Sequence, residues 1–145
     1  MEIEEWIKKD YLEKIIPDEK LVKKEFDEAE YDLKKAKLAL QEVDYKWCII
    51  KAYYSMFHAA KGVLFSLGLR EKKHFVVGIM LENLAKRGKL EFKFVNDYRG
   101  AMLAREEADY RYVHSKDTAE YLIEVAKEFQ MKMKELLKKI KPDEI

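Results

Sequence analysis

The chain has 145 residues, 39% of which are charged, but 29 Lys and Arg residues nearly balance 28 Asp and Glu residues. The resulting net charge of +1 excludes a global attraction to nucleic acid or to a membrane, so such binding would need a local patch. Cys48 is the single cysteine, which excludes an intramolecular disulfide and is typical of a reducing compartment. The N-terminus lacks the pattern of a signal peptide, and Lys51 and Lys61 interrupt the longest apolar run. We therefore expect a cytoplasmic protein without membrane contact.

Apolar residues recur at helical spacing throughout the first half of the chain. Residues 2–16 predict a short amphipathic helix that Pro17 ends. In residues 18–43 successive apolar side chains are alternately four and three positions apart. This spacing predicts a long helix with one buried face. Residues 45–68 are the most apolar stretch, and Gly68 stands where a left-handed C-terminal cap costs least. The stripe of this central helix comprises Ile50, Tyr53, Phe57, Ala60, Leu64 and Leu67.

The second half of the chain continues the helical pattern after a polar turn over residues 69–73. A helix is expected from about His74, with cations in its last turn and Gly88 just beyond its end. The next helix is expected over residues 90–109.

The last helix begins at Ser115 or at Asp117, where Asp117 and Glu120 would make a capping box, and it ends before Pro142. No segment shows the alternating pattern of a strand. The sequence therefore predicts one all-α domain over residues 1–145. We expect an antiparallel up-and-down bundle of four to five main helices plus a short N-terminal helix.

Arg105 interrupts the apolar stripe of the helix over residues 90–109. A guanidinium is charged at any physiological pH and is rarely buried without a partner. One interpretation is a structural ion pair with Asp109, one turn further along the helix. The other is that Arg105 lines a cleft or a dimer contact and faces a phosphate, which it can bind bidentately.

A polar run, REEADYRYVH, extends from Arg105 to His114. Tyr110 and Tyr112 offer stacking faces, Arg111 is a second cation, and His114 can titrate near neutral pH. Such tyrosines are more often packing residues with a solvated tip than platforms for bases.

Tyr54 and His58 lie one turn apart beside the central stripe, where they predict a core or interface pair or an addition to the cleft. The Glu-x-x-His spacing of Glu71 and His74 is found in di-iron bundles, which need this motif twice. It occurs once here, so we expect no metal. The sequence has no glycine-rich phosphate loop, so we also expect no cofactor. Met56 and the tyrosines beside the stripe add more apolar surface than the contact with one neighbouring helix would bury. This surplus predicts a homodimer.

Several of these segments together resemble the HEPN domain family. The resemblance rests on AYYSMFHAAKGVLFSLGL (52–69), on His74, on REEADY (105–110) and on the final helix, and it covers about residues 20–140. It implies an antiparallel helical bundle that is often a homodimer and is commonly encoded beside a minimal nucleotidyltransferase in toxin–antitoxin-like pairs.

Many HEPN proteins are metal-independent RNases with an arginine, a polar residue and, after four to six intervening residues, a histidine. In this chain eight residues separate Arg105 from His114, and the acidic Glu106 follows the arginine. The arginine of the family pattern therefore corresponds to Arg105, whereas His114 departs from the family spacing.

The function predicted from the resemblance is that of a partner of a minimal nucleotidyltransferase, which binds nucleotide or RNA through a cleft around Arg105. The predicted binding residues are Arg105, Asp109, Tyr110, Arg111, Tyr54 and His58. One alternative is an active RNase toxin in which neutral His114 takes the proton of an RNA 2′-hydroxyl and Arg105 stabilises the charge that develops on the phosphate. The second alternative is a non-catalytic helical adaptor.

Overall fold

The structure is a computed structural model that describes residues 3–142. It confirms an all-α bundle, to which a very small two-stranded sheet is added. The elements in chain order are α1 (Ile3–Lys8), β1 (Leu12–Lys14), α2 (Glu19–Gln41), α3 (Tyr45–Ser66), β2 (Leu69–Glu71), α4 (Val76–Lys86), α5 (Phe92–Tyr110) and α6 (Lys116–Lys139).

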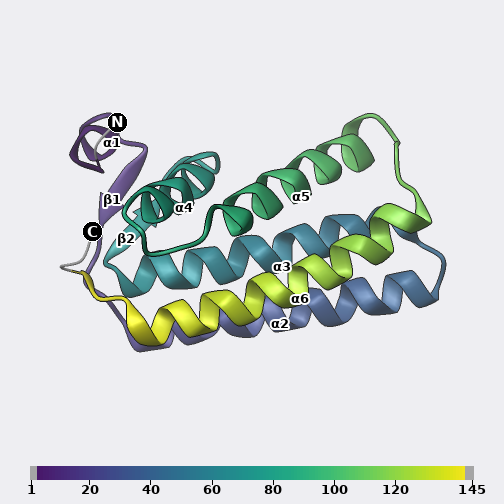
Figure 1. Cartoon of the computed structure of the whole chain (residues 1–145), viewed down its shortest axis with the longest axis horizontal. Coiled ribbons are helices and arrows are strands. Elements are labelled where there is room, and N and C mark those ends of the chain that lie inside the picture. Colours follow the sequence, from purple (N-terminus) through teal and green to yellow (C-terminus); the bar gives the residue numbers. More distant parts are fainter. Residues whose placement is uncertain (1–2, 143–145) are drawn as a thin grey trace.

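The central helix α3 is the core of the bundle. Helices α2, α3 and α6 run side by side along the long axis, and α5 lies over α3 at an angle to it (Figure 1). Small residues let α2 approach α3 closely. A Cβ added at Gly62 would lie only 2.5 Å from the ring of Phe26 on α2. Any larger residue at position 62 would therefore displace the ring of Phe26 from its place in the core.

The N-terminal segment differs from the prediction of one helix over residues 2–16, whose first residue lies outside the described part. Helix α1 ends at Lys8, and the chain turns at Asp10, which has a left-handed φ of 64°. Strand β1 then pairs antiparallel with β2, within the segment predicted as a polar turn. The expectation of no strand was wrong because each strand has only three residues, too few to show an alternating pattern.

The predicted helix ends are largely confirmed. Gly68 and Gly88 both have a left-handed φ, of 77° and 76°, directly after α3 and α4. Ser115, one of the two predicted starts, caps α6 by accepting a hydrogen bond from the backbone N–H of Thr118. Helix α4 begins two residues later than predicted, so His74 lies in the loop between β2 and α4.

The apolar surface that predicted a dimer lies in a different place from the one expected. Met56 and Tyr53 are fully buried within the chain, so the central helix offers no surplus apolar face there. The homodimer itself stays a prediction. Exposed large apolar side chains are spread over the surface. One group of them lies in the α2–α3 turn, at the start of α3, late in α5, in the α5–α6 loop and early in α6, which Figure 1 shows at one end of the bundle. This group comprises Val43, Trp47, Leu103, Tyr110, Tyr112, Val113 and Tyr121.

No helix in the described part of the chain is long and apolar enough to cross a membrane.

Candidate functional site

Arg105 projects from α5 into a group of tyrosine rings. Its guanidinium carbon lies 5.5 Å from the ring centre of Tyr54, 5.8 Å from that of Tyr53 and 5.7 Å from that of Tyr110. Its Nη2 donates a hydrogen bond of 3.0 Å to the Tyr54 hydroxyl. These contacts hold the guanidinium by cation–π attraction without neutralising its charge.

No carboxylate within residues 3–142 forms an ion pair with Arg105. The pair with Asp109 that the sequence left open is therefore not formed, although Asp109 is only one turn away. The Nε atom of Arg105 is buried and has no hydrogen-bond partner among these residues. Arg105 thus keeps both a full positive charge and unused donors.

His74 joins this group from the loop before α4. Its ring stacks on Phe57 with the two ring centres 4.2 Å apart and the planes 7° from parallel. Its Nε2 is hydrogen-bonded to the hydroxyl of Tyr53, whose ring also contacts Arg105. Partial burial, together with the positive charges of Arg105 and Lys61, lowers the pKa of His74. His74 is therefore mainly neutral at pH 7.

Two buried tyrosines connect His74 to the core of the bundle. The hydroxyls of Tyr53 and Tyr98 lie 3.2 Å apart, and both side chains are almost fully buried. Burial raises the pKa of Tyr53 to about 12 and also raises the pKa of Tyr98. Both phenols therefore stay protonated at neutral pH and act as hydrogen-bond donors.

The N-terminal segment fixes the loop that carries His74. Besides the β1–β2 pairing, the backbone N–H of Lys72 donates a 2.9 Å hydrogen bond to the carbonyl of Tyr11. The rings of Trp6, Tyr11 and Phe75 also contact one another, with centres 5.5–6.0 Å apart. The residues on both sides of His74 are thus held by α1 and β1.

His58, a predicted member of the site, faces α2 instead. Its Nδ1 lies 2.6 Å from a carboxylate oxygen of Glu25, and its Nε2 lies 3.6 Å from one of Asp32. No hydrogen bond or ion pair within the described residues joins it to Arg105. In the structure Tyr54 therefore contacts Arg105, whereas His58 belongs to a separate cluster.

This second cluster, here called the α2 acid cluster, consists of Glu25, Asp32, His58, Lys61 and Glu71. Lys61 lies 3.5 Å from Glu25 and 3.6 Å from Glu71. Burial raises the pKa of Asp32 and of Glu71. Burial would raise the pKa of Glu25 too, but its hydrogen bond with His58 and the charge of Lys61 lower it overall. Each cation here has a carboxylate partner.

The remaining predicted residues lie at or after the C-terminal end of α5. Tyr110 contacts Arg105, as described above, and Arg111 and His114 are exposed. Asp109 is half-buried and forms no ion pair with a described residue. No contact joins His114 to Arg105 within the described chain.

Sequence reasoning missed His74, Tyr53, Phe57 and Tyr98 as members of the site. The tyrosines and Phe57 were assigned to buried stripes, which is correct for their rings but overlooks the hydroxyls. For His74 the available signal was a histidine directly before an apolar helix.

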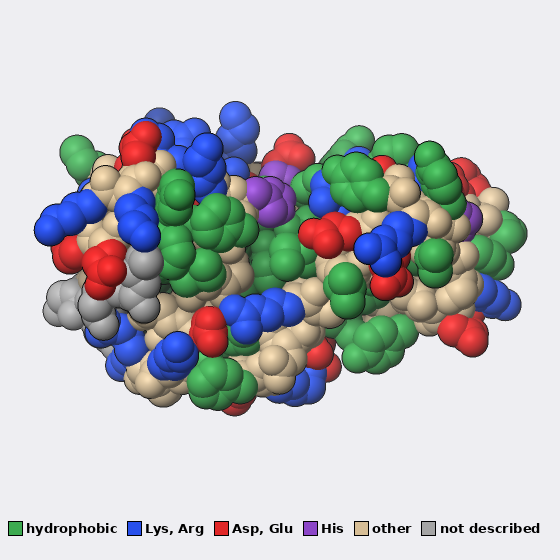
Figure 2. Space-filling model, turned by 90° about the horizontal axis from the view of Figure 1, so that it is seen from above, with side chains coloured by type: hydrophobic (Ala, Val, Ile, Leu, Met, Phe, Trp, Pro, Cys, Tyr) green, Lys and Arg blue, Asp and Glu red, His purple; other side chains and the backbone are tan. Residues whose placement is uncertain are grey.

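Figure 2 shows the bundle from the side on which α4 and α5 lie in Figure 1. The surface is hollowed between the end that carries α4 and the end of α5, and a histidine lies there among hydrophobic side chains. Arg105 is half-buried and His74 is exposed, so a ligand can reach both side chains from solvent.

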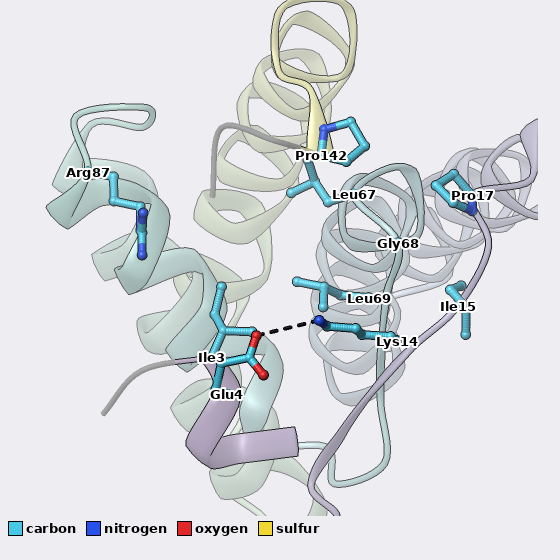
Figure 3. A pocket seen from close by; sticks show the side chains of 10 residues that line it. All are labelled: Ile3, Glu4, Lys14, Ile15, Pro17, Leu67, Gly68, Leu69, Arg87 and Pro142. Carbon is cyan, nitrogen blue, oxygen red and sulfur yellow. Dashed lines mark ion pairs between the residues drawn. The ribbon is translucent and has the colours of Figure 1, made fainter. Parts of the chain in front are cut away.

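Two open hollows lie elsewhere. One of about 440 Å³ lies between the N-terminal segment and the end of α3, and an ion pair of 3.5 Å between Glu4 and Lys14 borders it (Figure 3). The other, of about 840 Å³, lies between the start of α2 and the end of α6. Neither is lined by Arg105 or His74.

Comparison with known proteins places the chain in a family. Residues 22–136 match the HEPN domain, a range that includes Arg105 and His74 but not α1 or β1. The chain is 30% identical over 114 residues to "Putative toxin MJ0605" of Methanocaldococcus jannaschii, which covers 77% of this chain and 85% of that protein. It is also 30% identical over 122 residues to a "UPF0332 protein" of Archaeoglobus fulgidus, with 78% of this chain and 98% of that protein covered. The chain belongs to the HEPN domain family.

Proposed function

We propose that this HEPN protein binds a phosphate group of nucleotide or RNA at Arg105. The observation that carries the proposal is the uncompensated charge of Arg105, which tyrosine rings surround and no described carboxylate neutralises. A guanidinium with unused donors binds phosphate oxygens in a fixed geometry. Because the ring contacts hold this charge without neutralising it, an anion that reaches the guanidinium is attracted to it.

The rings around Arg105 also favour a nucleic-acid ligand over a simple anion. Tyr110 is 69% exposed and Tyr54 is partly exposed, so each can present part of its ring to a base. Base–aromatic stacking contributes about 1–3 kcal/mol per base and tolerates any sequence. Arg111, exposed just after Tyr110, is a second cation for the backbone of a bound strand.

We further propose that the protein is the partner of a minimal nucleotidyltransferase in a toxin–antitoxin-like pair and forms a homodimer. The HEPN match and a relative whose name includes the word toxin support the first part. The exposed apolar side chains at one end of the bundle, among them Tyr112 and Val113, support an interface there.

The alternative of an RNase that uses Arg105 and His114 requires a second copy of the chain. His114 does not contact Arg105 within one chain, but it is exposed and follows the exposed Val113 directly. A dimer that covers this end would be needed to deliver His114 to Arg105 of the other copy. Incubation with RNA in the presence of a chelator tests this alternative. Cleavage that His114→Ala abolishes would favour it over binding alone.

Fluorescence anisotropy with a labelled short single-stranded RNA tests the binding proposal. We expect Arg105→Ala to weaken binding at least about tenfold, since a charged hydrogen-bond donor contributes about 1.5–3 kcal/mol. Arg99→Ala is the matched control because Arg99 lies on the same helix but is already paired with Glu82 at 2.9 Å. Equal binding by wild type and Arg105→Ala would contradict the proposal.

A further inference from the structure

The hydroxyl of Tyr98 fixes the direction of a hydrogen-bond chain. Tyr98 is 1% exposed, and within residues 3–142 its hydroxyl has a single hydrogen-bond partner, the hydroxyl of Tyr53. A buried hydroxyl proton without an acceptor is costly, so Tyr98 donates to Tyr53.

The hydroxyl of Tyr53 then donates to His74. Tyr53 is fully buried, and Nε2 of His74 is the acceptor within reach of its proton. If Nε2 carried the proton instead, the Tyr53 oxygen would receive two donors and its own proton would have no acceptor. Because Nε2 accepts, a neutral His74 carries its proton on Nδ1.

The Nδ1 atom of His74 has no hydrogen-bond partner in the described part of the chain, and the residue is exposed. Stacking on Phe57 fixes the plane of the ring, and the bond to Tyr53 fixes which nitrogen is occupied. Arg105 contacts the same Tyr53 ring. The site therefore presents two sets of unused donors, and both belong to residues that contact Tyr53.

We infer that His74 is a second anion-binding residue of the Arg105 site and donates its Nδ1–H to an oxygen of the bound phosphate. This inference rests on the proposed function. It also names what His74 does not do: with Nε2 already accepting and Nδ1 protonated, the neutral ring has no free lone pair to take a proton from a 2′-hydroxyl. The ligand class is a phosphodiester or a terminal phosphate of a nucleotide, which His74 binds without acting as a base.

The first test is independent of any ligand. Nitrogen-15 NMR of the imidazoles distinguishes the two neutral tautomers, and we expect His74 to carry its proton on Nδ1. Tyr53→Phe removes the donor to Nε2 and should give a mixture of tautomers. A wild-type protein with the His74 proton on Nε2 would overturn the inference while leaving Arg105 binding intact.

The second test is binding of the labelled RNA to His74→Phe, a substitution that keeps the stack on Phe57 but removes the donor. We expect about a tenfold loss of affinity, with circular dichroism unchanged. Arg99→Ala, the control used for Arg105, serves here too and should bind as wild type. Wild-type affinity in His74→Phe, with binding still lost in Arg105→Ala, would overturn the role of His74 alone. If wild type binds no RNA and no nucleotide, both this role and the proposed function fail.

Discussion

Two groups of charged side chains border the ring of Phe57, and they differ in how their charge is balanced. In the α2 acid cluster, Lys61 lies between Glu25 and Glu71. In the other group, Arg105 contacts three tyrosine rings and no described carboxylate. Both groups approach Phe57, through Lys61 at 5.4 Å from its ring centre and through the stacked ring of His74.

The comparison distinguishes the charges of the α2 acid cluster, which stabilise the fold, from the charge of Arg105, which is left to bind a ligand. A mostly buried cation between two carboxylates is satisfied by the protein itself, and removing it deprives each of the two acids of that partner. A cation held by rings keeps its charge and its unused donors. Substitutions in the first group should therefore change stability, whereas substitutions in the second should change binding.

The largest expected effect is on stability, for Lys61→Ala. Its side chain is only 18% exposed, and its loss leaves Glu25 and Glu71 without their shared cation. We expect the free energy of unfolding in urea to fall by about 3 kcal/mol. Lys116→Ala, which removes an exposed lysine from its pair with the exposed Glu120, should change it by less than about 1 kcal/mol. Similar losses for the two variants would contradict the contrast.

The two acids that share Lys61 should respond to pH in opposite directions. The pKa of Glu25 is lowered from its ordinary 4.5, so its stabilising contribution is present above that value and is lost as the pH falls through the lowered pKa. The pKa of Glu71 is raised, so its contribution is greatest at low pH and is lost as the pH rises through the raised pKa.

Urea unfolding of Glu25→Gln and Glu71→Gln between pH 3 and pH 7 measures this difference. Glu25→Gln should be less stable than wild type at pH 7 and should approach wild type as the pH falls. Glu71→Gln should be as stable as wild type or more stable at pH 7. The same pH trend in both variants would show that the pKa values of Glu25 and Glu71 are not shifted in opposite directions.

Arg105 and Asp109 should behave as independent residues. Because they form no ion pair, we expect Arg105→Ala to cost about 1 kcal/mol of stability, mainly from lost ring contacts. The effects of Arg105→Ala and Asp109→Ala should add in the double variant to within about 0.5 kcal/mol. A large loss of stability in each single variant that the double variant recovers would instead support a structural ion pair between Arg105 and Asp109. The reason to expect a ligand at Arg105 would then be gone.

Much of the fold was predictable because local chemistry decides it. Gly68 and Gly88 end helices through their left-handed backbone, and Ser115 begins one through its side chain. The β1–β2 pairing was not predictable, since it joins Leu12–Lys14 to Leu69–Glu71, segments far apart in sequence and only three residues long. Pairing at such a distance depends on how the bundle brings the segments together.

The site was predictable where a residue violated a pattern. Arg105 interrupts an apolar stripe. Tyr54 was predicted to bind the same ligand as Arg105, and the structure brings the two side chains into contact. His58 was placed with Tyr54 because one helical turn separates them, but the acids of α2 decide where His58 points. His74 was missed because its position depends on a loop that β1 holds, and loop positions carry no periodic signal.

The smallest expected effect concerns the segment outside the HEPN match. Trp6→Ala removes one of the three rings that hold the loop of His74. We expect RNA binding to weaken about threefold, equivalent to about 0.7 kcal/mol, and the NMR signals of His74 to broaden. Phe92→Ala removes an exposed ring elsewhere and should leave both unchanged. Unchanged His74 signals in Trp6→Ala would show that the N-terminal segment does not position this residue.

The most direct test of the central claim, that the charge of Arg105 is left for an anion, is the pKa of His74 measured by NMR. Partial burial and the charge of Arg105 lower this pKa in the free protein. Saturation with a nucleotide monophosphate should raise it, because the phosphate offsets the charge of Arg105. Arg105→Ala should raise it without ligand and remove the further change on adding nucleotide. A His74 pKa that neither the nucleotide nor Arg105→Ala alters would contradict the account.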